Sequence, residues 1–320
     1  MPFFSGRCLS TIKLAGKTAL VTGCNTGIGK ETVLDFYKRG ARVIMACRSL
    51  DKAMEAKSDI EEKCKNLTDT GNIVLVKCDL SSLKSVRECA QTILDTEAQI
   101  NILVNNAGVM MCPKGFTEDG FETQFGTNHL AHFLLTMLLL PRIINSKPAR
   151  IVTVSSAAHT RYNINFEDPN FKTRSYSAMS AYSQSKLANV LFSRELANKL
   201  KEHNIEGVNT YSLHPGVIKT ELGRHLNDTL FKGARPIIGF LFSPFMKSPE
   251  LGAQTSIYCA LDEKCANESG LYYSDCAVIS PDRKALKDDD AKKLWDLSVS
   301  LVGIDNYDPF TFKDQGVKTK

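Results

Sequence analysis

The 320-residue sequence lacks the features that would place it in several specialised classes of protein. Its ten cysteines form no Cys-x-x-Cys pair and no His/Cys cluster with zinc spacing, which argues against a zinc module or a disulfide scaffold. The longest helical apolar run, Leu130 to Leu140, is too short to cross a bilayer. The net charge of +5 is small and scattered, so we expect no nucleic-acid partner.

The amino-terminal segment also lacks a targeting signal. Met1 to Ala15 is too short and too interrupted by polar residues for a signal peptide or a spanning helix. We therefore expect a cytoplasmic protein that is not secreted. Peripheral contact with an intracellular membrane through Phe3 and Phe4 is left open.

Apolar strand patterns alternate with helical patterns along the whole chain, without a linker or a repeat. The strands are continuously apolar, which is typical of a parallel sheet covered on both faces. We expect a single α/β domain with a doubly wound parallel sheet at residues 17–320, preceded by an extension at 1–16. The predicted strands are Thr18–Thr22, Ala41–Ala46, Ile73–Cys78, Ile100–Val104, Arg150–Val154, Val208–Leu213 and Tyr272–Tyr273. The predicted helices are Lys30–Lys38, Lys52–Lys65, Ser82–Asp95, Thr123–Leu140, Tyr182–His203 and Pro249–Leu261.

A glycine-rich turn joins the first predicted strand to the first helix. Glycine there permits a tight exit from the strand and a close approach of backbone to a pyrophosphate, and the helix amino terminus favours the phosphates. A tight strand-to-helix turn also serves structure alone, but this position favours dinucleotide binding. The candidate cofactor-binding residues are Gly23, Asn25, Thr26, Gly27, Ile28 and Gly29.

Arg48 follows the second predicted strand, where the adenosine ribose of a dinucleotide would lie. An acid at this position suits the 2′-hydroxyl of NAD, whereas an arginine suits the 2′-phosphate of NADP. The nearest acid, Asp51, comes three residues later. The pattern favours NADP(H), with a solvated surface charge as the alternative.

Two further strand ends carry candidate cofactor contacts. Asp79, followed by Leu80, could accept a hydrogen bond from an adenine amino group, or could simply flank the helix that Ser82 begins. The run Asn105-Asn106-Ala107-Gly108 would let the chain pass close to the cofactor, or could be a plain strand-ending turn.

Tyr182 and Lys186 are four residues apart on a predicted helix, so they share one face. A nearby lysine favours the phenolate and lowers the phenol pKa, which would let the phenol exchange a proton with a substrate oxygen. Ser156, the second serine of the pair that follows a strand, could hold the same oxygen. Such a pair also occurs for structural reasons, but behind a dinucleotide-binding turn it favours catalysis.

Jointly, these motifs resemble the short-chain dehydrogenase/reductase family, over Lys17 to about Asp275. The resemblance implies a Rossmann fold, with Tyr182 as catalytic acid/base and Ser156 orienting the substrate oxygen. It implies that Lys186 lowers the Tyr182 pKa and binds the nicotinamide ribose, and that Asn128 helps hold a water in the proton relay. From its sequence position alone, Asn128 could instead be an amide near a helix kink. The implied contacts at the nicotinamide end are Pro215, Gly216 and Thr220.

Within that family the chain looks most like the retinol dehydrogenase branch. The matching stretches are Ala46-Cys47-Arg48, Asn128 to Thr136, Tyr182 to Asn189 and Leu213-His214-Pro215-Gly216. Members of that branch typically use NADP(H), in agreement with Arg48. Several relatives also carry an N-terminal hydrophobic anchor, which this sequence does not contain.

The apolar stretch Leu230 to Met246, broken by glycine and proline, predicts a lid over an elongated lipophilic substrate such as a retinoid, a prenyl or long-chain aldehyde, or a steroid. A satellite core patch and an interface with a membrane or second subunit are the alternatives. An NADP(H)-dependent oxidoreductase on a lipophilic alcohol and its carbonyl, most simply retinol and retinal, is therefore expected. A non-catalytic NADP(H)-binding scaffold is the alternative. A homodimer, which is common in the family, is left open.

Overall fold

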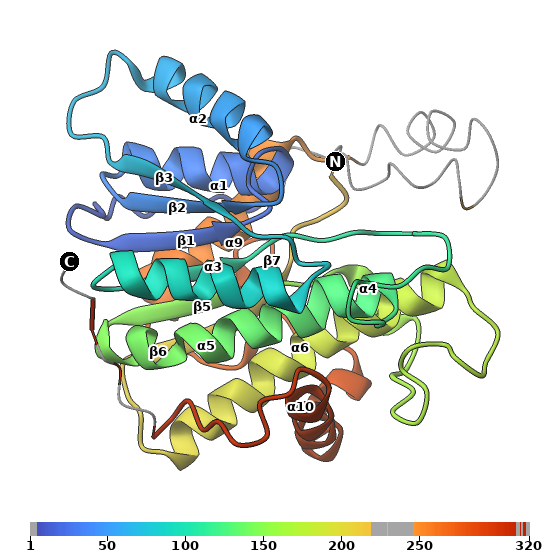
Figure 1. The fold of residues 1–320 in the computed structure, drawn as a ribbon. Coiled ribbons are helices and arrows are strands. Elements are labelled where there is room, and N and C mark those ends of the chain that lie inside the picture. The colour runs from blue at the N-terminus through green and yellow to red at the C-terminus, as the bar shows by residue number, and fades with distance from the viewer. Residues whose placement is uncertain (1–4, 219–228, 230–245, 312–313, 315, 318–320) are drawn as a thin grey trace.

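The computed structural model describes residues 5–218, 229, 246–311, 314 and 316–317. Within these residues an eight-stranded sheet has the order β3-β2-β1-β4-β5-β6-β7-β8 (Figure 1). The strands are β1 (Thr18–Thr22), β2 (Arg42–Cys47), β3 (Asn72–Lys77), β4 (Ile102–Asn105), β5 (Ala149–Val154), β6 (Val208–His214), β7 (Leu271–Ser274) and β8 (Ala277–Val278). All neighbouring pairs from β3 to β7 are parallel, and β8 pairs antiparallel with β7. The expected doubly wound sheet is confirmed, with one short antiparallel strand that the sequence analysis did not predict.

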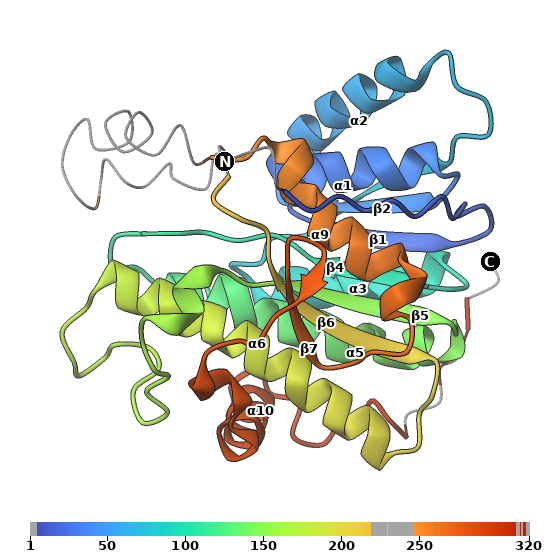
Figure 2. The same cartoon turned by 180° about the vertical axis from the view of Figure 1, so that it is seen from behind.

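Helices cover both faces of the sheet, as the two opposite views show (Figures 1 and 2). One hydrophobic cluster joins the sheet to α1, α2 and α9, and a second joins it to α3, α5, α6 and α10. Alternate strand residues such as Leu20 and Val21 belong to different clusters, as a period of two requires. The helices are α1 (Gly27–Lys38), α2 (Leu50–Cys64), α3 (Leu83–Thr96), α4 (Thr123–Phe125), α5 (Ala131–Asn145), α6 (Ala178–Glu202), α9 (Pro249–Leu261) and α10 (Asp288–Leu301).

The predicted helix Thr123–Leu140 is not one continuous α-helix in the structure. It begins with the short α4, passes through a π-helical turn at Gly126–Leu130 and continues as α5 beyond Pro141 to Asn145. Proline removes the N–H that would bond to the carbonyl four residues earlier. Here the Tyr307 hydroxyl donates to that carbonyl, on Met137, at 3.4 Å, so the helix continues.

Helix α10 was missed by the sequence analysis, although its pattern is readable. Its buried residues Ala291, Leu294, Trp295 and Ser298 recur at helical spacing, and three aspartates occupy its first turn. Trp295 packs edge-on against Phe133 of α5, with ring centroids 5.1 Å apart. This helix therefore completes the core beside α5 and α6.

No helix in the described part of the chain is long and apolar enough to span a membrane.

Candidate functional site

The predicted site residues gather at the carboxyl ends of the parallel strands. The glycine-rich turn follows β1, Arg48 follows β2, Asp79 follows β3, the Asn105–Gly108 segment ends β4, Ser156 follows β5, and Pro215 follows β6. Strand order reverses between β1 and β4, which lie side by side. Ligands of open α/β sheets bind in the crevice at such a switch point.

The turn after β1 approaches the segment after β4 so closely that only glycine fits. Gly23 has a φ of +61°, and a Cβ added to it would lie 2.6 Å from the Ala107 Cβ. Gly27 also has a positive φ, of +58°. A Cβ on Gly29 would lie 2.5 Å from Nδ2 of Asn106, whose amide donates to the carbonyls of Thr22 and Gly23. Gly23 and Gly29 therefore allow the close approaches that a side chain would block, whereas the approach of Gly27 to a pyrophosphate stays a prediction.

Helix α1 begins without the groups that satisfy a helix amino terminus elsewhere in the described chain. Its N-cap residue, Thr26, makes no side-chain capping bond, and its first turn holds no acid. In contrast, a serine caps each of α2, α3, α6 and α9. The first N–H groups and the positive dipole end of α1 are therefore available to an anion, as a dinucleotide phosphate requires.

The adenosine-side candidates are placed differently from one another. Arg48 is exposed and forms no ion pair with any described residue. Asp79 already accepts bonds from the Ser81 N–H and hydroxyl, at 2.9 and 2.7 Å, and lies just before the helix that Ser82 caps. Leu80 is buried in the core. The amide of Asn105 is also buried and donates to Thr136 of α5 at 2.9 Å.

Tyr182 and Lys186 lie together on the buried face of α6, with exposed fractions of 4% and 3%. The Lys186 ammonium donates to the Val154 carbonyl at 3.1 Å and lies 5.8 Å from the centre of the Tyr182 ring. Ser156, which is half-buried, begins the short 3-10 turn Ala157–Thr160 after β5 and lies beside the Tyr182 hydroxyl. The structure thus places the predicted serine beside the buried tyrosine and lysine.

The pKa values of this cluster differ from the expected direction. Burial raises the pKa of Tyr182 to about 12, and the hydrogen bond with Ser156 only opposes that rise. Burial also lowers the pKa of Lys186 to about 8. Lys186 is not among the causes of the Tyr182 shift, in which burial is the largest, and its ammonium donates to the Val154 carbonyl; its role in lowering the phenol pKa stays a prediction. Tyr182 consequently carries its proton at neutral pH.

Asn128 lies within the π-helical turn and is fully buried. Its Oδ1 accepts the Val109 N–H at 2.8 Å, and its Nδ2 donates to the Val109 carbonyl and the Ser185 hydroxyl, both at 2.9 Å. A Cβ on Gly108 would lie 3.3 Å from Asn128 Oδ1 and 3.5 Å from Lys186 Nζ. Asn128 therefore braces the segment after β4 against α6, close to Lys186.

Sequence reasoning did not assign roles to several residues that hold this cluster together. Ser155, the first serine of the pair, donates to the Lys186 carbonyl at 2.6 Å. Asn189 donates to the same Val154 carbonyl as Lys186. Thr22 accepts the N–H groups of Asn106 and Ala107, both at 3.0 Å. Their positions at strand ends or on the Tyr182 face of α6 were the available signal.

The nicotinamide-side candidates are described only in part. Gly216 has a φ of +100°, and its N–H bonds to Nδ1 of His214 at 3.4 Å. Pro215 lies between them, directly after β6. Thr220, most of the predicted lid Leu230–Met246, and Phe3 and Phe4 lie outside the described residues.

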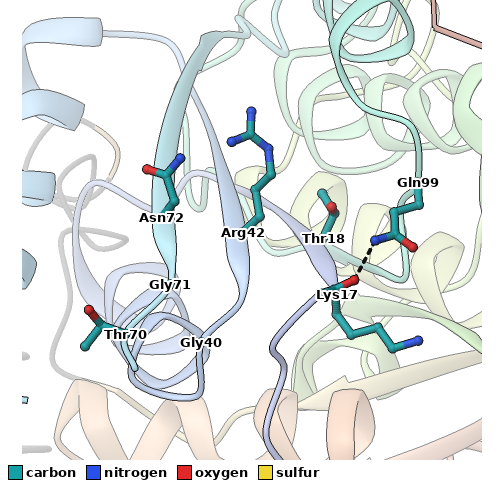
Figure 3. A pocket seen from close by; sticks show the side chains of 9 residues that line it. Lys17, Thr18, Gly40, Arg42, Thr70, Gly71, Asn72 and Gln99 are labelled. Atoms are coloured by element: carbon teal, nitrogen blue, oxygen red, sulfur yellow. Dashed lines mark hydrogen bonds between the residues drawn. The ribbon is translucent and has the colours of Figure 1, made fainter. Parts of the chain in front are cut away.

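The described residues also outline a cavity of about 390 Å³ at the opposite edge of the sheet (Figure 3). It lies at the amino ends of β1, β2 and β3, and its lining includes Lys17, Arg42 and Asn72. None of the predicted site residues lines it. We therefore assign the site to the carboxyl edge, where the glycine-rich turn and Tyr182 lie.

Comparisons with known proteins agree with this assignment. Residues 17–230 match the model of the short-chain dehydrogenase family. The chain is 47% identical over 302 residues to human "Retinol dehydrogenase 12", covering 94% of this chain and 91% of that protein. It is 45% identical over 300 residues to human "Retinol dehydrogenase 13", covering 94% and 88%.

Solved structures share the fold. A crystal structure of an uncharacterized protein from Mycobacterium paratuberculosis superposes with a TM-score of 0.73 at 33% identity, covering 93% of this chain and 98% of that one. The Pseudomonas aeruginosa RhlG/NADP complex superposes with a TM-score of 0.62 at 26% identity, covering 85% and 96%. The resemblance drawn from the motifs is confirmed: the chain belongs to the short-chain dehydrogenase/reductase family, as an oxidoreductase acting on CH–OH donors.

Proposed function

We propose that this chain is an NADP(H)-dependent oxidoreductase that interconverts a lipophilic alcohol and its carbonyl, most simply retinol and retinal. The observation that carries the proposal is that the buried Tyr182 and Lys186 lie beside the half-buried Ser156 at the carboxyl edge of the sheet. A buried, protonated phenol beside a serine hydroxyl can donate a proton to a carbonyl oxygen held by both groups. The bound dinucleotide supplies or accepts the hydride.

The residue roles follow from this placement. Tyr182 exchanges the proton with the substrate oxygen, and Ser156 orients that oxygen. Lys186 holds a positive charge beside the phenol and binds the nicotinamide ribose, as the family resemblance implies. Its ammonium lies near the segment after β4, since a Cβ built on Gly108 would be 3.5 Å from Nζ. Asn128 fixes that segment through Val109. Asn128 also helps hold a water molecule in the proton relay.

Short-chain dehydrogenases use NAD(P), and the chain's residues fit such a group. The uncapped amino terminus of α1 and the glycines at 23, 27 and 29 suit the pyrophosphate. We infer NADP(H) rather than NAD(H), because Arg48 is exposed after β2 and unpaired with any described acid. The NADP complex named in the solved relative at 26% identity supports this choice.

A lipophilic substrate is supported by two observations. Residues Val109 to Cys112, which follow Gly108, are apolar. The Thr229 hydroxyl donates a hydrogen bond to the carbonyl of Met111 within this segment. The relatives at 45–47% identity are named retinol dehydrogenases. The direction follows the ratio of reduced to oxidised cofactor, so carbonyl reduction is the expected direction with NADPH in excess.

The direct test follows NADPH absorbance with purified protein and all-trans-retinal, with NADH in parallel. Tyr182→Phe keeps the ring but removes the proton, so we expect kcat to fall by about 10³-fold. Tyr211→Phe is a matched control, because Tyr211 is also buried but its hydroxyl donates to the Cys265 carbonyl. NADPH binding without turnover on retinal, farnesal, long-chain aldehydes or steroids would contradict the enzyme and favour a non-catalytic scaffold.

A further inference from the structure

Two buried histidines lie three residues apart and face different parts of the molecule. His129 in the π-helical turn and His132 at the start of α5 are each 1% exposed. The His129 Nε2 is 2.9 Å from the Ser298 hydroxyl of α10, in the core. The His132 Nε2 is 2.8 Å from the Thr22 hydroxyl at the end of β1, where the glycine-rich turn begins. The catalytic and cofactor roles above use neither histidine.

The partners of His132 determine which of its ring nitrogens donates a hydrogen bond and which accepts one. Its Nδ1 is 3.1 Å from the Asn128 carbonyl, which can only accept, so Nδ1 carries the proton. Burial lowers the pKa of His132 to about 4, so the ring is neutral and Nε2 has a free lone pair. The Thr22 hydroxyl therefore donates to Nε2, while its oxygen accepts the N–H groups of Asn106 and Ala107.

His132 thus holds both ends of the segment from Asn106 to Val109. Through Thr22 it orders the N–H groups at the start of this segment. Through the Asn128 backbone it anchors the residue whose side chain bonds Val109 at the other end. The middle of the segment is closely packed. A Cβ built on Gly23 would lie 2.6 Å from the Ala107 Cβ, and one built on Gly108 would lie 3.3 Å from Asn128 Oδ1 and 3.5 Å from Lys186 Nζ.

We propose that His132 is a positioning residue that fixes the spacing between the dinucleotide-binding turn after β1 and the π-helical turn that carries Asn128. The inference rests on the proposed NADP(H) function but concerns a separate property. His132 does not touch the reacting atoms. Its two bonds set cofactor affinity through Thr22 and turnover through Asn128.

The test separates the two bonds with two substitutions. In His132→Gln the side-chain amide oxygen can reach the position of Nε2 and accept from Thr22. In His132→Asn the amide nitrogen can take the position of Nδ1 and donate to the Asn128 carbonyl. His132→Leu removes both bonds at similar volume. His129→Leu is the matched control, since it removes an equally buried imidazole that faces α10.

The measurements are the Kd for NADPH by fluorescence titration, kcat and KM with retinal, and the Tm of each variant. We expect His132→Leu to raise the NADPH Kd about tenfold and to lower kcat, as the loss of a buried hydrogen bond predicts. His132→Gln should recover most of the affinity, and His132→Asn most of kcat. His129→Leu should lower the Tm with less than about a twofold change in Kd.

The outcomes test three statements separately: the positioning role of His132, the division of roles between its two bonds, and the proposed function. NADPH affinity and kcat that stay at wild-type values in all three His132 variants, with only the Tm lowered, would overturn the positioning role. If His132→Leu cannot be purified, the Gln and Asn variants still decide it, since equal losses in both would contradict the division between the two bonds. Wild-type protein that binds no NADPH would contradict the proposed function itself.

Discussion

The two edges of the sheet contain similar polar side chains, but folding uses them differently. At the amino edge, Arg42 is paired with Glu97 at 2.6 Å, and the buried Arg142 bonds to Asp314 and to the Leu94 carbonyl. At the carboxyl edge, Arg48 pairs with no described residue, and α1 begins without a cap. At the carboxyl edge, Arg48 and the amino terminus of α1 are therefore left available to a ligand, and neither residue type nor the cavity in Figure 3 identifies this edge.

Buried charge gives the sharpest form of this contrast. Arg142 is 1% exposed and has a carboxylate partner, whereas Lys186 is 3% exposed and its ammonium donates only to a carbonyl among the described residues. Burial accordingly lowers the pKa of Lys186 from 10.5 to about 8. A cation without a counterion destabilises the fold, and its retention is explained by function.

The largest expected effect comes from replacing these two cations by methionine. Lys186→Met should lower kcat/KM for retinal by about 10³-fold or more. It should also raise the free energy of unfolding at pH 7 by roughly 2 kcal/mol, because the unfolded chain binds that proton more tightly than the folded one. This gain should disappear as the pH rises through 8 towards 10.5, where the ammonium is lost in both states.

Arg142→Met should have the opposite pattern. It leaves the Asp314 carboxylate and two carbonyls without their donor, so the free energy of unfolding should fall by about 3–5 kcal/mol. The kcat of the folded fraction should be unchanged. Chemical denaturation and steady-state kinetics measure both quantities. A Lys186→Met protein less stable than wild type, or an Arg142→Met protein with altered kcat, would break the contrast between the edges.

The next largest effect concerns Arg48, with Arg42 as its control. Arg48→Asp should lower the ratio of kcat/KM with NADPH to that with NADH by about a hundredfold, because it removes one charge-assisted hydrogen bond and adds repulsion to the 2′-phosphate. Arg42→Ala is the control at the amino edge, where the guanidinium is bound to Glu97. An unchanged cofactor ratio in Arg48→Asp would remove Arg48 from the cofactor site.

Most of the fold was predictable, because apolar strand runs and helix starts are local signals. The predicted bounds of β1 and α9 match the structure, and Ser82 caps α3 as expected. The continuation through Pro141 was not predicted, because proline usually ends a helix; in the structure the Tyr307 hydroxyl, distant in sequence, donates to the Met137 carbonyl that the proline leaves without its helical donor. The local rule for proline was correct, but a tertiary contact supplied the missing donor.

The candidate site shows the same division. Strand-end position indicated where Ser156 lies, and the spacing of four along a helix placed Tyr182 and Lys186 on one face. The position of Asn128 came from the family resemblance alone. The sequence could not give the sign of the Tyr182 pKa shift, since spacing along α6 places Lys186 on the same face without showing that its ammonium bonds to Val154. Nor could it show that the amide nitrogen of Asn105 donates to Thr136 while its Oδ1 has no partner among the described residues.

The last expected effect needs no substitution and is a difference in pH dependence between the two reaction directions. Since the pKa of Tyr182 is about 12, its proton is present for carbonyl reduction and must leave before alcohol oxidation. Initial rates of retinol oxidation should therefore rise by up to about tenfold per pH unit between pH 7 and 9. Retinal reduction should stay level up to about pH 8, where Lys186 loses its proton, and decline above it. Arg42→Ala should leave both profiles unchanged, because that cation belongs to the opposite edge. Oxidation that is independent of pH over this range would mean that Tyr182 is not the group that accepts the proton.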